Sequence, residues 1–218
     1  ESDSNANMLF VEGGTDRVAI GHSSPNAKLD IMGQGTSATN LSMLIGADEG
    51  GTANPSRSDA TDKAVRIGMP HRTNAEEPAA LLTASSTSSD NTIMIGGGTS
   101  VMNAATNIRF ITGANTTTTS GSERVRIDSS GTILHGKTTD TQNDAGHVMF
   151  TNGAAYATRS DGFTYLFNRT SSNGELLRFQ KASTTVGGIG FQANGIYINS
   201  GNVGLTFYPP ADSIFPTD

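Results

Sequence analysis

Few side chains of this chain are of the kinds that do chemistry, and those few are widely spaced. The 218 residues include four histidines, His22, His71, His135 and His147, and no cysteine. Thiol nucleophiles, disulfides and cysteine-based metal sites are therefore excluded. No pair of histidines has the spacing of a zinc-binding motif such as H-x-H or H-E-x-x-H. We expect no cofactor, and no metal site built by one chain alone.

Carboxylates are the other candidates, because a glycosidase needs two of them several ångströms apart in a cleft. The groupings that could supply such a pair are Glu76 with Glu77, Asp59 with Asp62, and the single Asp161. Sequence neighbours such as Glu76 and Glu77 rarely face one another, so solvated surface acids are the better interpretation. The sequence also contains no G-x-S-x-G nucleophile elbow. A protein without catalytic activity is favoured.

Aromatic and cationic side chains near the C-terminus indicate binding rather than catalysis. Only two aromatic residues precede position 150, whereas eleven lie between 150 and 215. Tyrosine combines an apolar ring with a polar tip, and arginine donates to anionic groups in a fixed fork. We therefore predict that Tyr197, Tyr208, Arg159 and Arg169 contact a receptor, such as an anionic glycan.

Short strands are the elements that must position these residues. Apolar residues alternate with polar ones in runs that end at a turn former, at 17–21, 65–68, 93–96, 125–128, 196–199 and 203–207. This two-residue period predicts β-strands. The dipeptides 152–153 and 173–174 (both Asn-Gly) predict hairpins, and 163–167 reads as core on a strand. Because Pro78 limits 74–82 to a turn or two of helix, the predicted fold class is all-β with little helix.

Composition predicts that one chain cannot build its own core. Leu, Ile, Val and Phe make up 42 of the 218 residues, about 19%. Charged residues make up 16% and the net charge is −6, which argues against disorder and against nucleic acid as a partner. Apolar faces that are too small alone can be buried against copies of the same chain, so we predict an obligate homo-oligomer. No apolar run approaches the length that spans a membrane, and membrane insertion is not expected.

Composition shifts divide the chain into three predicted regions. Residues 1–35 form an N-terminal strand or shaft unit, and 36–136 form a middle β region rich in Ser, Thr and Gly. Residues 137–218 form an aromatic-rich C-terminal β module, in which packing energy is concentrated. The run 116–120 is of low complexity and predicts an exposed loop.

Three stretches of the chain have the pattern of known sequence repeats. Residues 16–31 read DRVAIGHSSPNAKLDI, and residues 121–131 read GSERVRIDSSG. They are similar to the repeat R-V-G-I-G-T-S-S-P-x-x-K-L-x-V and to the element E-R-M-R-I-D-S-S-G of phage tail fibres, in particular those of marine and cyanobacterial phages. The segment 201–216 resembles a G-L-x-F … I-x-P stretch that often precedes a self-cleaving intramolecular chaperone. Ala19 and His22 depart from the repeat, which has a structural role only.

The resemblance implies an elongated homotrimeric fibre of short strands, with β-sandwich, β-prism or β-helix-like modules. It implies an extracellular location in the virion tail, with other tail proteins attached N-terminal to this segment. Its partners would be its own copies and a host cell-surface glycan, bound by adhesion rather than cleaved. An end at Asp218 would suit cleavage just downstream of this residue.

In a trimer, one histidine could take part in binding a metal ion. His135 lies in the strand-like run 133–136, so three copies of it could meet at a trimer axis and hold a metal ion. A surface or hydrogen-bonded histidine is the favoured interpretation.

Two other functions stay open from the sequence. A tailspike that depolymerises polysaccharide would place its carboxylates in a groove between chains. A structural subunit of an extracellular fibril would form open-ended polymers, where a tail fibre forms closed trimers.

Overall fold

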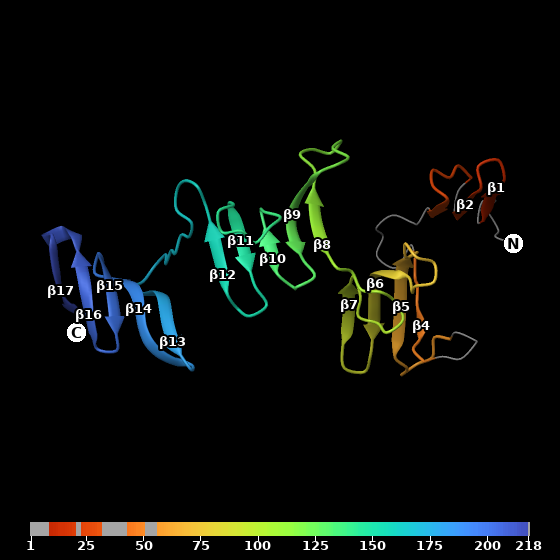
Figure 1. The fold of residues 1–218 in the computed structure, drawn as a ribbon. Helices are drawn as coiled ribbons and strands as arrows, with labels where there is room; N and C mark the ends of the chain where they lie inside the picture. Colours follow the sequence, from red (N-terminus) through yellow and green to blue (C-terminus); the bar gives the residue numbers. More distant parts are fainter. Residues whose placement is uncertain (1–8, 21–22, 32–42, 51–55, 218) are drawn as a thin grey trace. The chain divides into compact units, whose positions relative to one another are not determined.

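The structure is a computed structural model that describes residues 9–20, 23–31, 43–50 and 56–217 (Figure 1). The described residues form seventeen strands and one three-residue 3-10 turn, so the predicted all-β class is confirmed. His22, Asp218 and the predicted boundary at 35/36 lie outside the described residues. The chain divides into two compact units, Glu1–Thr106 and Asn107–Asp218. That division falls inside the predicted middle region, because composition does not report which strands pair.

The first unit contains two sheets. The smaller is ordered β1-β2-β3, with an antiparallel and then a parallel pairing, and the larger is an antiparallel sheet ordered β4-β5-β6-β7. Their bounds are β1 (Phe10–Glu12), β2 (Arg17–Ile20), β3 (Leu29–Ile31), β4 (Ala47–Asp48), β5 (Lys63–Met69), β6 (Ala79–Ser86) and β7 (Asn91–Ile95).

The second unit contains two antiparallel five-stranded meanders, β8 to β12 and β13 to β17, in which each strand pairs with the next. Such sheets need only short turns between strands. The first has bounds β8 (Ile108–Thr112), β9 (Ser122–Ile127), β10 (Ile133–His135), β11 (Gly146–Met149) and β12 (Ala155–Thr158). The second comprises β13 (Gly174–Lys181), β14 (Thr184–Gln192), β15 (Gly195–Ser200), β16 (Val203–Tyr208), the turn η1 (Pro209–Ala211) and β17 (Ser213–Thr217).

Most local predictions from the sequence are confirmed, and two are wrong. Each of the six alternating runs contains or overlaps a strand, and Asn152-Gly153 joins β11 to β12 with Gly153 at φ 88°. The Asn173-Gly174 hairpin is wrong, because Gly174 begins β13 and β12 does not pair with β13. The strand at 163–167 is wrong as well, since this segment is extended coil with exposed side chains. Residues 79–82 belong to β6 and are not helical.

The sheet β8 to β12 has one face covered by its own loop. On that face lie the two best-buried apolar side chains of this unit, Leu134 and Val148, which are 2% and 0% exposed. The loop 137–144 is held there by Lys137, whose Nζ donates to the carbonyls of Thr141 and Asp144. The phenol of Tyr156 donates to the Asp140 carbonyl. This face therefore needs no second chain.

The sheet β4 to β7 is covered in the same way on one face. The segment 96–105 folds back against β6, where Ala80 N donates to the Asn103 carbonyl over 2.9 Å. Thr83 is buried and its Oγ1 donates to the Gly97 carbonyl over 3.0 Å. The opposite face carries Ile93 and Ile95, which are both exposed. Across the described residues, the only buried apolar side chains are Ala19, Pro25, Ala80, Leu134 and Val148.

Candidate functional site

The candidate site is a pocket at the first edge of the sheet β13 to β17. It has a volume of about 450 Å³ and is lined by Arg169, Gly174, Glu175, Leu176, Arg178 and Tyr197. Two of the four predicted receptor-binding residues, Arg169 and Tyr197, are therefore brought together. They lie 28 positions apart in sequence, and the meander makes them neighbours because it stacks β13, β14 and β15 side by side.

Two glycines of β14, Gly188 and Gly190, lie beneath residues that line this pocket. Gly190 pairs with Glu175 on one side and with Tyr197 on the other. A Cβ built on Gly190 would lie 2.5 Å from Cζ and Oη of Tyr197, and one on Gly188 would lie 3.0 Å from Oε1 of Glu175. The phenol ring and the carboxylate thus lie directly on bare backbone. A side chain at either position would displace them.

Arg169 reaches the pocket from the segment before β13 and is held by short-range hydrogen bonds. Its Nε donates to the Ser172 carbonyl over 2.8 Å, and its Nη2 donates to Ser172 Oγ over 3.0 Å. Its guanidinium lies over Gly174, where a Cβ would be 2.8 Å from Cζ. These contacts, with a longer bond of 3.5 Å from Nη1 to the Glu175 carbonyl, fix the group. One N–H of each terminal nitrogen stays available for a ligand.

Arg178 and Glu175 form an ion pair at the other side of the pocket. Arg178 Nε donates to Glu175 Oε2 over 2.5 Å, and the two side chains are 60% and 27% exposed. With Arg169, the pocket holds two guanidinium groups and one carboxylate, so its formal charge is positive. Such a set binds a carboxylate, sulfate or phosphate group, while the tyrosine ring and phenol suit a sugar ring and its hydroxyls.

The other two predicted receptor-binding residues do not line this pocket. Tyr208 is two residues beyond Thr206, the cross-strand partner of Tyr197, so it lies farther along the same face. Its ring contacts that of Phe215, with centroids 5.8 Å apart. Arg159 follows β12, and its guanidinium lies over Gly162 and donates to the Phe163 carbonyl over 3.4 Å. Their roles stay predictions.

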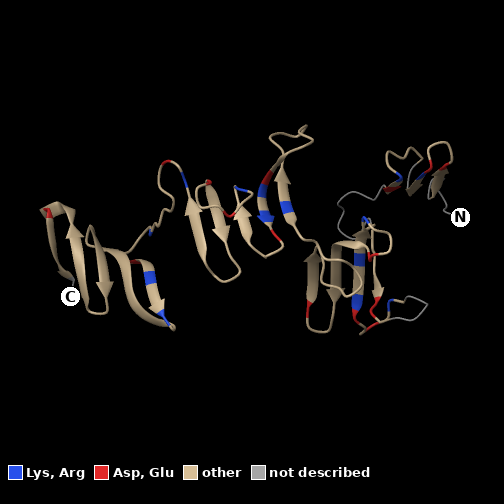
Figure 2. Cartoon of the chain, viewed as in Figure 1, with Lys and Arg blue, Asp and Glu red and all other residues tan. Residues whose placement is uncertain are grey.

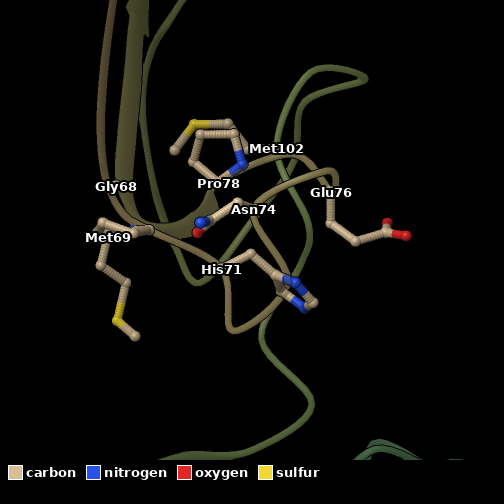
Figure 3. Close-up of a pocket in the computed structure, with 8 residues that line it drawn as sticks. Gly68, Met69, His71, Asn74, Glu76, Pro78 and Met102 are labelled. Atoms are coloured by element: carbon tan, nitrogen blue, oxygen red, sulfur yellow. The ribbon is translucent and has the colours of Figure 1, made fainter.

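The candidate carboxylates lie in separate loops. Asp59 and Asp62 are exposed in the segment before β5, and Asp161 is exposed between β12 and β13. Glu76 lines a cavity of about 480 Å³ near the ends of β5 and β6, and Glu77 does not (Figure 3). Figure 3 shows the Glu76 carboxylate extending away from His71 and the other labelled side chains. Thr73 N donates to His71 Nδ1 over 3.1 Å.

His135 lies in β10 as predicted, and its cross-strand partner is His147. No group of three His, Cys, Asp or Glu side chains that could hold a metal ion occurs among the described residues.

Sequence reasoning missed Glu175 and the two glycines beneath the pocket residues, Gly188 and Gly190. A signal was present, because glycine at alternate positions inside a strand marks a close approach of another group.

No described helix is long and apolar enough to cross a membrane. Comparisons with protein-family models, curated proteins and solved structures give no match to this chain.

Proposed function

We propose that this chain is a non-catalytic segment of a phage tail fibre, which associates as a homotrimer and presents a surface that binds a host cell-surface glycan. The observation that carries the proposal is an open apolar face on the sheet β13 to β17. Its side chains come from all five strands and are between 37% and 76% exposed: Phe179, Phe191, Ile196, Ile198, Val203, Leu205, Phe207 and Ile214.

The cross-strand register places these side chains on one face. Ile198 is paired with Ile189 on one side and with Leu205 on the other, and Ile196 is paired with Phe191 and Phe207. Directly paired residues point to the same side of a sheet. The four strands β14 to β17 contain no charged residue, and their ribbons are tan in Figure 2. Nothing on these strands would oppose burial of the face.

The size of the face is that of an interface between proteins. Eight half-exposed side chains present a patch on the order of 700 Å², whereas the largest apolar patch of a typical monomer is about 300–600 Å². A stable interface buries about 800 Å² on each partner. Exposing this patch to water would favour aggregation, so a partner of the same apolar character is required.

Copies of the same chain are the partner that this arrangement fits best. In the sheets β4 to β7 and β8 to β12, one face is covered by a loop of the chain and the other carries exposed apolar side chains such as Ile93, Ile95, Phe110 and Met149. Three chains set around an axis would bury each such face against the next. The resemblance to tail fibres supports three as the number of copies.

The pocket of Arg169, Arg178 and Tyr197 supports the recognition part of the proposal. Glu175 and Tyr197 share the row of Gly190, and alternation places this row opposite the apolar face of the same sheet. Association through the apolar face would therefore leave Glu175 and Tyr197 in solvent. Arg169 lies at the edge between the two faces, because it also lines a cavity of about 550 Å³ with Phe191, Ile196 and Phe207. Three copies in one trimer would let weak individual contacts add to a strong attachment.

The experiment is to measure the native mass by light scattering and to run the same sample on a denaturing gel, unboiled and boiled. A mass of three chains that persists without boiling is the expected result. A monodisperse monomer would refute the proposal, and open-ended polymers would favour a fibril subunit. Incubation with host polysaccharide separates binding from cleavage, because shortened glycan would identify a depolymerase.

A further inference from the structure

We propose that His135 and His147 form a binding site for one divalent transition-metal ion of the Ni²⁺, Zn²⁺ or Cu²⁺ class. The two residues lie directly opposite one another in the antiparallel pair β10 and β11. Both side chains are exposed, on the open face of this sheet. Both ligands come from one chain, so the site needs no second chain to form, although association through this open face, which also carries Phe110, would bury it.

The spacing of the two rings suits a shared ion. Their centroids are 5.8 Å apart and their planes are inclined by 47°. An ion that is bound about 2.0–2.1 Å from one nitrogen of each ring lies about 3.2 Å from the centroid of that ring. If the two nitrogens subtend a tetrahedral angle at the ion, the two ring centroids are about 5.2 Å apart. The observed separation needs only a small adjustment of two surface rotamers. The two imidazoles are therefore close to a chelating arrangement before any ion binds.

The scaffold beneath the pair is the best-packed part of the unit. The neighbouring cross-strand pair is Leu134 with Val148, whose side chains are buried on the opposite face. Strand β10 is held between β9 and β11 in the centre of the sheet. A site built on paired strands keeps its ligands in place better than one built on loops, which lowers the entropic cost of binding.

The side chains around the pair do not repel a cation. In the same cross-strand row, the pair is flanked by Val125 on β9 and Ala157 on β12. The ring of Tyr165 meets the His147 ring edge-on, with centroids 5.7 Å apart and planes at 89°, and so restricts its rotation. Neutral imidazole is a common ligand for Zn, Cu and Ni, and water would fill the remaining positions on the ion.

The test is calorimetric titration of the intact chain with Ni²⁺ and with Zn²⁺, under metal-free starting conditions. One ion per chain is expected. His135→Ala and His147→Ala should each weaken binding at least tenfold, since either leaves a single imidazole. His71→Ala is the matched control and should bind as the unchanged chain does. Circular dichroism of each variant confirms that the strands are retained.

A second measurement locates the ion without relying on variants. Paramagnetic Ni²⁺ should broaden the nuclear magnetic resonance signals of residues 133–135 and 147–149 before any others. The proposal is overturned if the unchanged chain binds no ion, or if broadening centres elsewhere. It is also overturned if His135→Ala abolishes binding and His147→Ala does not, because that pattern fits one ion shared by three copies of His135.

Discussion

The ring of Tyr197 lies across the bare backbone of Gly190, its cross-strand partner in the sheet β13 to β17. A Cβ on Gly190 would lie 2.5 Å from the tip of that ring and 2.6 Å from the Gly174 carbonyl oxygen. The tyrosine therefore depends on a glycine for its position. The same glycine holds β13 close to β14.

Gly190→Ala should move the tyrosine ring and push β13 away, because one of the two close contacts is to backbone that cannot rotate aside. We expect a loss of about 1–3 kcal/mol in the free energy of unfolding, measured by chemical denaturation. Gly14→Ala is the control, since a Cβ there meets nothing within 4 Å. Equal stability of the two variants would contradict the close contact.

Arg169→Ala should weaken binding of a carboxylated oligosaccharide, such as oligogalacturonate, at least tenfold. The reason is that charge-assisted hydrogen bonds from a held guanidinium are lost. Neutral dextran of the same length should bind poorly to both forms. Arg72→Ala serves as the matched control, because Arg72 is exposed in the first unit and does not line the pocket. If this control variant lost binding and Arg169→Ala kept it, the recognition surface would lie elsewhere.

Ile198→Lys should prevent self-association, because it places a charge in the centre of the open apolar face. The neighbouring substitution Asn199→Lys introduces the same charge on the opposite face and should leave the mass unchanged. Light scattering measures both. The proposed interface would be excluded if Ile198→Lys kept the full oligomeric mass.

Lys137→Met should release the loop 137–144 from the sheet β8 to β12. Lys137 is buried, and its Nζ donates to two loop carbonyls and lies 5.2 Å from the centre of the Tyr156 ring. Loss of hydrogen bonds from a charged group costs about 2 kcal/mol. Amide hydrogen exchange should accelerate in the loop. Lys181→Met, at an exposed strand end, should change exchange little.

Asp48 should make the first unit sensitive to acid. Its carboxylate accepts from Lys63 Nζ over 2.8 Å, from Ser56 Oγ over 2.6 Å and from Ser58 N over 3.0 Å. These bonds, that from Lys63 first, hold the pKa of Asp48 well below its usual range. A pKa lowered by folding stabilises the folded state above the unfolded value, near 4, and this stabilisation disappears as the pH falls further.

The substitution Asp48→Asn tests this account by thermal unfolding at neutral and acidic pH. It should lower the melting temperature at neutral pH and reduce the further drop below about pH 4. Asp59→Asn, which changes an exposed carboxylate, should keep the acid dependence of the unchanged chain. An unaltered acid response in Asp48→Asn would assign the sensitivity to another group.

Local chemistry made the strands predictable from the sequence. In 196–199, two isoleucines alternate with a tyrosine and an asparagine. This two-residue period fixes which side chains share a face of the sheet. Asn152-Gly153 was predictable as a hairpin because its glycine adopts a positive φ. The same dipeptide at 173–174 gave a wrong hairpin prediction, because a turn signal does not reveal whether the flanking segments pair. The aromatic run 163–167 misled for a similar reason, as alternation alone cannot supply a neighbouring strand.

The sequence by itself determined that this protein is built of short strands with one apolar side each, and that few apolar residues are available for a core. Only the tertiary structure decided which residues meet: Tyr197 on Gly190, Arg169 in one pocket with Tyr197, and His135 opposite His147. The physical reason is that periodicity depends on neighbours along the chain. Register depends on hydrogen bonds between strands, and a shift of one residue would turn each of these side chains to the other face.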